Sequence, residues 1–462
     1  MNTKLYTQRK KIILIIICAF ISQLILIGLA GIKGNTVYDV LSILLITVIM
    51  IFIYLYQPEI FIKYLWFIII SIWGILAVFI LENGSIILRG KQAYHYGSFP
   101  TYCLGWIVFW GVIIFCEINK KIKNSETKNY NEIKPSINTI KNLKIISYFV
   151  ICWMLICFIS IVYKPYFLYG IDRFQYNKEF MPQLVSRSLP YLYAFIPIPL
   201  MLRKEEKKLS YLYCGIFILL DFWCGEKFTG LILIFYLIML TINPICISEE
   251  MIKYTKKIIK IIGVLIILLF GIVIVQQFVL GLKMSDISNY FENRIAAQGE
   301  LWWLTYAKDA NQGTHFDEIS DEINVLINQP VGKMSDYYFG IYKLMKLFMK
   351  ADWVKYALTN GVRATESTRA TFYYYGKIPG LIIGQLLIGI LVAFVVNKII
   401  INCNQRRWLL ACGYMYLFKS LITVSIMSDF QLLTTTKMIL VYIVLFVFSN
   451  KKKLTFRSRK NE

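Results

Sequence analysis

Long apolar runs separated by short polar turns make up most of this chain. The runs approach the length of about 20 residues that a helix needs to cross the hydrocarbon core of a bilayer. The pattern predicts an all-α, polytopic integral membrane protein with about twelve transmembrane helices. The predicted spans are residues 11–32, 37–56, 60–81, 101–118, 145–163, 189–202, 210–224, 228–246, 258–280, 373–396, 408–428 and 433–449.

One polar, aromatic segment of about ninety residues, 282–372, interrupts this pattern between the ninth and tenth spans. Residues 286–309 are predicted to form a helix that continues the ninth span and holds Arg294 a turn or two above the membrane. Residues 336–358 have the pattern of an amphipathic helix, which would lie on lipid headgroups or on the protein's own surface. We therefore expect a single membrane domain, 1–462, with this large loop inserted.

The formal charge of +23 would suggest a nucleic-acid partner in a soluble protein. Here the lysines and arginines concentrate in loops that fall on one side when twelve spans are counted. The positive-inside rule then places both termini in the cytoplasm and the 282–372 loop outside. That loop is nearly balanced, with ten Lys and Arg against eleven Asp and Glu. The excess of lysine and arginine therefore indicates how the chain is oriented in the membrane, and no nucleic-acid partner is predicted.

Sequence motifs of soluble enzymes are missing. The chain has no GxxxxGK[ST], no GxGxxG after a strand and no HExxH. Its two histidines are His95 and His315, and its ten cysteines form no CxxC pattern. A nucleotide-hydrolysing pump and a histidine-based zinc site are not indicated. No cofactor or metal is predicted, so energy must come from an ion gradient or an activated substrate.

Cations near the outer membrane surface are the first candidates for chemistry. Arginine forks match phosphate oxygens two at a time, so a cluster at headgroup depth suits a lipid-linked diphosphate. Each of these cations could instead pair with a headgroup or a nearby acid. The candidates are Arg173, Arg187, Lys227, Arg294, Arg363 and Arg369.

The 296–303 run combines an amide, a carboxylate and two indoles within about two helical turns. Such groups hold sugars through hydroxyl hydrogen bonds and ring faces, although paired tryptophans also mark a membrane interface. Candidate general bases are His315, Glu300 and Glu366. Lys419, in the eleventh span, should face the bundle interior with Asp221 or Asp429 as its partner.

At these residues the chain resembles the Wzy-type O-antigen and capsular repeat-unit polymerases, a group that includes O-antigen ligases. The likeness rests on the number of spans, the large outer loop and three short runs, 225–227, 294–303 and 373–380. Arg369 and Gly380 also match an Arg-x10-Gly pattern of the family. Lys227 stands where such polymerases usually carry arginine, which keeps the charge and loses the bidentate fork.

The resemblance implies a GT-C-like glycosyltransferase in the bacterial cytoplasmic (inner) membrane. It would move a growing glycan from undecaprenyl diphosphate onto an incoming lipid-linked repeat unit, among membrane lipids and beside a chain-length regulator and a flippase. No cofactor is implied, because the donor is already activated. The resulting site assignments are Arg173, Lys227, Arg294 and Arg369 for the diphosphate, Gln298, Glu300, Trp302 and Trp303 for sugar, and Arg294, Glu366 and His315 for catalysis.

Two alternatives remain open at this point. A ligase that hands finished glycan to another acceptor is chemically closest to a polymerase. A transporter or flippase of lipid-linked saccharide would also have about twelve spans and a cationic cavity. Transporters normally carry repeated halves and polar residues at midplane, whereas this chain has no visible repeat and concentrates its polar residues in one outer loop.

Overall fold

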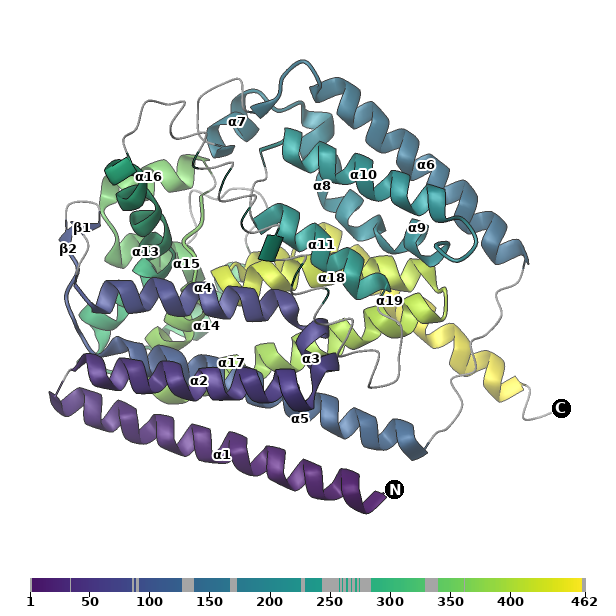
Figure 1. The fold of residues 1–462 in the computed structure, drawn as a ribbon. Coiled ribbons are helices and arrows are strands. Elements are labelled where there is room, and N and C mark those ends of the chain that lie inside the picture. The colour runs from purple at the N-terminus through teal and green to yellow at the C-terminus, as the bar shows by residue number, and fades with distance from the viewer. Residues whose placement is uncertain are drawn as a thin grey trace. The chain divides into compact units, whose positions relative to one another are not determined.

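The structure is a computed structural model of the chain. It describes residues 2–33, 35–84, 87–88, 91–126, 137–166, 173–225, 229–242, 284–328, 340–360 and 362–458, and the seven helical residues 257, 260, 263, 264, 267, 271 and 274. These residues are almost entirely helical, with one pair of two-residue antiparallel strands, β1 (Ile87–Leu88) and β2 (Lys91–Gln92). The predicted all-α class is confirmed. Figure 1 labels the elements, which group into two compact units.

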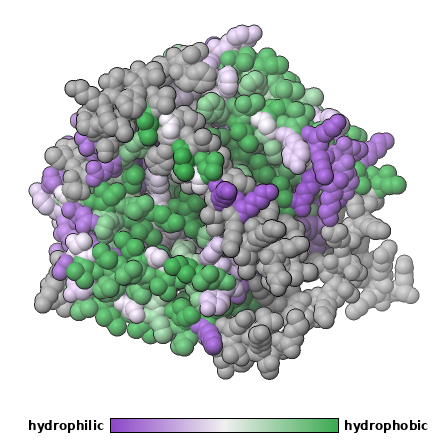
Figure 2. Space-filling model, viewed as in Figure 1, coloured by the Kyte–Doolittle hydropathy of each residue, from purple (hydrophilic) through white to green (hydrophobic). Residues whose placement is uncertain are grey.

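The first unit contains most of the predicted outer loop and the first four spans. Its helices are α1 (Asn2–Lys33), α2 (Thr36–Tyr56), α3 (Pro58–Lys63), α4 (Leu65–Glu82), α5 (Ser98–Glu126), α13 (Met284–Asp309), α14 (Glu318–Asn328), α15 (Gly340–Phe348), α16 (Ala351–Asn360) and the larger part of α17 (Ser367–Asn404). Helices α4 and α5 form its core, whereas α1 and α2 leave many apolar side chains exposed, as lipid-facing helices do. Figure 2 shows this apolar surface in green.

The second unit contains α6 (Ile137–Ile161), α7 (Arg173–Glu179), α8 (Gln183–Phe195), α9 (Pro197–Met201), α10 (Lys207–Trp223), α11 (Thr229–Ile242), most of α18 (Trp408–Met427) and α19 (Thr436–Ser458). The predicted sixth span is divided into α8 and α9 at Pro197, because proline cannot donate the backbone hydrogen bond that a continuous helix needs. Lys419 lies over the ring of Tyr193, 3.8 Å from its centre, and the Tyr193 hydroxyl donates to Asp221. Lys419 thus belongs to a polar group that includes Asp221, one of its two predicted partners.

Seven of the described helices are long and apolar enough to cross a membrane, and two shorter apolar helices accompany them. The chain is therefore a membrane-embedded helical protein. The count of twelve stays a prediction, because most of the predicted ninth span, 258–280, lies outside the described residues. The single-domain organisation also stays a prediction.

The helix predicted at 286–309 is confirmed as α13, which packs along α4. Gly299 makes this packing close, since a Cβ on it would lie 2.9 Å from Val78 Cγ2 and 3.0 Å from the Val78 nitrogen. The amphipathic stretch predicted at 336–358 forms two helices, α15 and α16. The apolar side chains of α15 are buried except Leu347, and α15 packs against α13, so its apolar face lies on the protein itself.

Candidate functional site

The start of α17 has an irregular backbone. Glu366, immediately before the helix, has φ of +55°, and Lys377 has φ of +53°. The helix is broken at Gly376 and Lys377, just before Pro379, so residues 367–375 form a short helical segment of their own. Non-glycine residues in this conformation cost about 1–3 kcal/mol each and cluster at functional sites. The predicted tenth span begins at 373, six residues inside the actual helix.

An ion pair is buried at this segment. Arg369 donates to the carboxylate of Glu366, and the two residues are 1% and 2% exposed. Nε of Arg369 has no hydrogen-bond partner among the described residues. A guanidinium removed from water in this way is available to a further acceptor, because an unsatisfied buried donor is unfavourable.

Helices α4 and α5 make room for this pair with two glycines. A Cβ on Gly74 would lie 2.6 Å from Oε1 of Glu366, and a Cβ on Gly105 would lie 3.3 Å from Cδ of Arg369. The guanidinium carbon of Arg369 lies 3.4 Å from the centre of the Trp106 ring, a close cation–π contact. Both charged groups are thus enclosed by α4 and α5.

The electrostatics of Glu366 follow from this enclosure. Burial raises the pKa of Glu366 above its ordinary value, and the charge of Arg369 and a hydrogen bond from Tyr102 only partly oppose it. Trp106 in turn donates to the Tyr102 hydroxyl at 3.1 Å. Glu366 is therefore a carboxyl group that holds a proton more readily than a carboxylate in water.

Aromatic rings form the next layer around the pair. Trp302 is fully buried, with ring centres 5.4 Å from Tyr102 and 5.5 Å from Tyr373. Tyr306 stacks on Tyr373 at 5.3 Å. Trp302, a predicted sugar-binding residue, thus lies against Tyr102, which donates a hydrogen bond to Glu366. The Trp302 ring is not exposed to solvent.

The other predicted residues of α13 differ in their exposure and contacts. Gln298 accepts from Thr365, beside Glu366, at 2.8 Å, and its own amide lies 3.4 Å from the Arg294 carbonyl oxygen. Arg294 is exposed, and Glu300 is buried at 6% exposed. Helix α13 therefore carries an exposed guanidinium at one point and a buried aromatic face farther along.

His315 belongs to a separate polar network. Its Nε2 lies 3.0 Å from Asp309 and its Nδ1 3.2 Å from Glu318, and its ring stacks on Tyr374 with centres 4.1 Å apart. Lys343 bonds to Glu318. Burial raises the pKa of Glu318, but the hydrogen bond and positive charge of Lys343 lower it more, so that this pKa lies below its ordinary value. His315 is thus fixed by two acids and a ring, rather than free on the surface.

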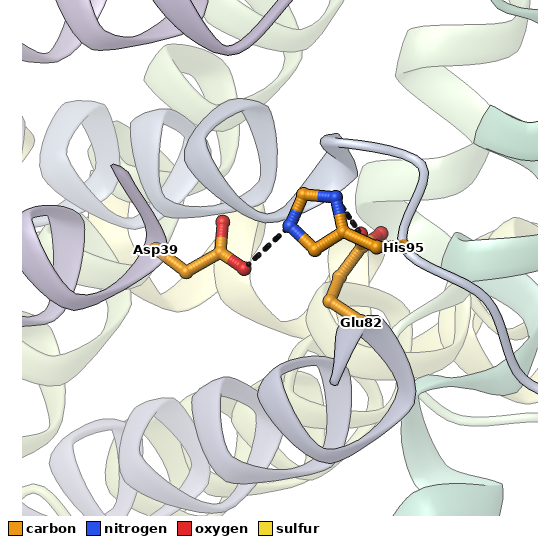
Figure 3. A group of neighbouring side chains, drawn as sticks. All are labelled: Asp39, Glu82 and His95. Atoms are coloured by element: carbon orange, nitrogen blue, oxygen red, sulfur yellow. Dashed lines mark hydrogen bonds and ion pairs between the residues drawn. The ribbon is translucent and has the colours of Figure 1, made fainter. Parts of the chain in front are cut away.

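A third cluster was missed in the sequence. His95 lies between Asp39 of α2 and Glu82 of α4, with Nε2 at 3.1 Å from Asp39 and Nδ1 at 3.8 Å from Glu82 (Figure 3). The feature of the sequence that could have indicated this cluster is Asp39, an acidic residue within an apolar run.

These three side chains could hold a metal ion by the spacing of their ligand atoms, all within 4.8 Å. Yet Glu82 already accepts backbone hydrogen bonds from Tyr96 at 2.8 Å, Gly97 at 3.0 Å and Ser98 at 3.2 Å, as well as the Ser98 hydroxyl. The cluster therefore joins α2, α4 and the start of α5 without requiring an ion.

The side chains of two residues predicted to bind the diphosphate lie outside the part of the chain that the structure describes. Lys227 lies outside the described residues, and only the backbone of Arg173, the first residue of α7, is described. Gly225, with φ of +87°, turns the chain directly before Glu226 and Lys227. Of the other cations predicted on the outer side, Arg363 pairs with Asp429 at 2.6 Å, and Arg187 is exposed. The convergence of four cations on one diphosphate stays a prediction.

Fold and site together define a helical membrane protein with a buried acid–guanidinium pair at the head of one long helix. Comparisons with models of protein families, with curated proteins and with solved structures found no match to this chain.

Proposed function

We propose that the chain is a membrane glycosyltransferase that polymerises undecaprenyl-diphosphate-linked oligosaccharide repeat units on the outer side of the bacterial cytoplasmic membrane. The observation that carries the proposal is the dry Glu366–Arg369 pair, enclosed by aromatic rings at the start of α17. Both residues were selected from the sequence for parts of one reaction, and they are neighbours in space. The twelve spans and cytoplasmic termini belong to this proposal.

Glu366 would act as the general base. The acceptor hydroxyl oxygen bonds to the anomeric carbon, the bond from that carbon to the diphosphate oxygen breaks, and the hydroxyl proton passes to the Glu366 carboxylate. A carboxyl group with a raised pKa suits this role, because proton transfer is most efficient when the catalytic pKa approaches the working pH.

Arg369 would stabilise the departing diphosphate. Preorganised charge in a water-excluded site is usually the largest contribution to such a reaction. Phosphate oxygens that replace the Glu366 carboxylate on Arg369 would free that carboxylate to accept the proton. The Nε donor of Arg369, which has no partner among the described residues, adds a second hydrogen bond for the same anion.

Arg294 would contact the diphosphate from α13. It lies eight residues before Trp302, which corresponds to ~12 Å along the helix axis. It is exposed, so a substrate can reach it without a rearrangement of the core. Arg173 and Lys227 are the further cations of this proposal, His315 is its second candidate base, and Gln298, Glu300, Trp302 and Trp303 are its candidates for sugar contacts.

Reconstitution tests the proposal. Purified protein in liposomes, supplied with lipid-linked repeat units and no nucleotide or added metal, should give a ladder of lengthened glycans. A single transfer to another acceptor, without a ladder, would identify a ligase. Movement of the units between leaflets at unchanged length would identify a transporter and contradict the proposal.

A further inference from the structure

A small pocket lies beside α13, and neither residue of the ion pair lines it. Its volume is about 300 Å³, the lower end of the range for ligand sites. Residues from two distant parts of the chain line it, among them Gln92, Tyr94, Tyr96, Trp303 and Lys308. None of the described residues that line it is acidic.

Three aromatic rings meet at this pocket. Tyr94 is 59% exposed and Tyr96 is 45% exposed, whereas Trp303 is nearly buried. The rings of Tyr96 and Trp303 have centres 5.2 Å apart, and Trp303 Nε1 donates to the Tyr94 carbonyl oxygen at 3.0 Å. The indole thus forms a fixed wall of the pocket, and the two phenol rings remain open to a ligand.

The segment that carries the two tyrosines is fixed by contacts with two buried acidic side chains. His95, between them, lies between Asp39 and Glu82, as Figure 3 shows. Glu82 also accepts the backbone N–H of Tyr96. The His95 side chain is mostly buried, whereas Tyr94 and Tyr96 on either side of it are exposed, so the two phenol rings lie on the open side of this segment. A site held in place before the ligand arrives loses less entropy on binding.

The chemistry of the lining selects the ligand class. Aromatic faces cover the C–H surface of a sugar ring, and the Gln92 amide and the phenol hydroxyls offer hydrogen bonds to its hydroxyls. The Lys308 ammonium donates to the Phe348 carbonyl oxygen at 3.0 Å, and an ammonium group has three donors. Gln92 is itself fixed, because its Nε2 donates to the Gly84 carbonyl oxygen at 2.6 Å. With a lysine and no acid, the lining also accepts a sugar carboxylate.

We infer that this pocket, formed by Gln92, Tyr94, Tyr96, Trp303 and Lys308, binds one pyranose unit of a glycan. The inference rests on the proposed function only for the source of that glycan, which would be the lipid-linked saccharide. Trp303 was expected to contact sugar from the sequence, whereas the two tyrosines come from the segment before α5. Tyrosines that merely anchor the protein in lipid headgroups are the competing explanation.

Saturation-transfer NMR on the full chain in nanodiscs tests the inference. The probes are methyl glycosides of glucose, galactose, rhamnose and N-acetylglucosamine, together with oligosaccharides cut by mild acid from the surface polysaccharide of the producing cells. Wild-type protein should transfer saturation to at least one probe, and Tyr94→Ala and Tyr96→Ala should each reduce it at least fivefold. Tyr163→Ala, at a tyrosine that is 89% exposed elsewhere, is the matched control and should have no effect.

Two outcomes would overturn the inference: no transfer to any probe, or equal transfer in the wild type and in the Tyr94→Ala/Tyr96→Ala double variant. The second outcome is what headgroup anchoring predicts. The test is independent of polymerase activity. Sugar binding without chain growth would keep the pocket and reject the proposed reaction, and chain growth without sugar binding here would do the reverse.

Discussion

Burial and charge act in opposite directions on Glu366. Removal from water favours the protonated form of its carboxyl group, whereas Arg369 and the Tyr102 hydroxyl favour the ionised form, and burial is the larger effect. The positive φ of Glu366 adds a local cost at the same residue. The burial of this carboxyl group and its positive φ both oppose folding, and the packing of α4 and α5 around the pair compensates for them. Glu366 is therefore a residue at which the proposed function would be gained at the expense of folding stability.

Glu366→Gln should change how stability depends on pH. A carboxyl group with a raised pKa in the folded state binds its proton more tightly there than in the unfolded state. Its contribution is fully present below the unfolded pKa and is lost as pH rises from about 4.3 through the raised folded pKa. Glutamine cannot titrate, so the variant should lack this fall in thermal midpoint, measured in detergent between acid and neutral pH. Parallel curves for wild type and variant would refute the assignment.

Arg294→Ala should abolish chain growth and leave the fold intact. An exposed guanidinium contributes little to stability, whereas removal of one group that stabilises developing charge lowers a rate by about 10²–10³-fold. Polymer formed by the purified variant should fall by that factor at an unchanged thermal midpoint. Lys355→Ala removes another exposed cation, on α16, and serves as the control that should retain activity. Near-normal polymer from Arg294→Ala would remove Arg294 from the site.

At the scale of single residues, the sequence identified Glu366 and Arg369 and not their environment. Their spacing of three residues allowed a contact. Their enclosure depends on Gly74, Gly105 and Trp106, which belong to helices about 260 positions or more earlier in the chain. A single sequence carries no signal for such long-range neighbours.

Among the elements, the close pair α4–α13 joins a predicted span to the predicted outer loop. The loop helix was predictable from its own pattern, and 286–309 agrees with α13 within two residues at its start. The surface on which this helix packs was not predictable, because the small size of Gly299 matters only through its contact with Val78 of α4. The continuous span predicted at 373–396 missed the break in α17, which Pro379 could have indicated, whereas nothing in the sequence indicated the positive φ of Lys377.

Gly299→Val should loosen this contact. Its side chain would meet the Val78 backbone and side chain, and overpacking of this kind costs about 1–3 kcal/mol. The apparent thermal midpoint in detergent should fall by several degrees. Gly313→Val, where an added Cβ meets nothing within 4 Å, should change it little. Equal effects of the two substitutions would show that α13 does not depend on close packing at Gly299.

For the whole molecule, the predicted topology places both termini inside and the 282–372 loop outside. A membrane-impermeant maleimide should label Asn311→Cys in intact cells and Lys451→Cys only after permeabilisation, each in a background without the native cysteines. The reason is the concentration of cations in one set of loops. Labelling of Lys451→Cys in intact cells would reverse the orientation and remove the loop from the outer side.

In the proposed reaction, the glycan leaves a lipid diphosphate as it joins the next repeat unit. The most direct test counts the lipid diphosphate released and the repeat units joined by the purified protein in liposomes without nucleotide. We expect one lipid diphosphate for each unit added, with both quantities falling together in Arg294→Ala. Repeat units that cross the bilayer with no lipid diphosphate released would contradict it.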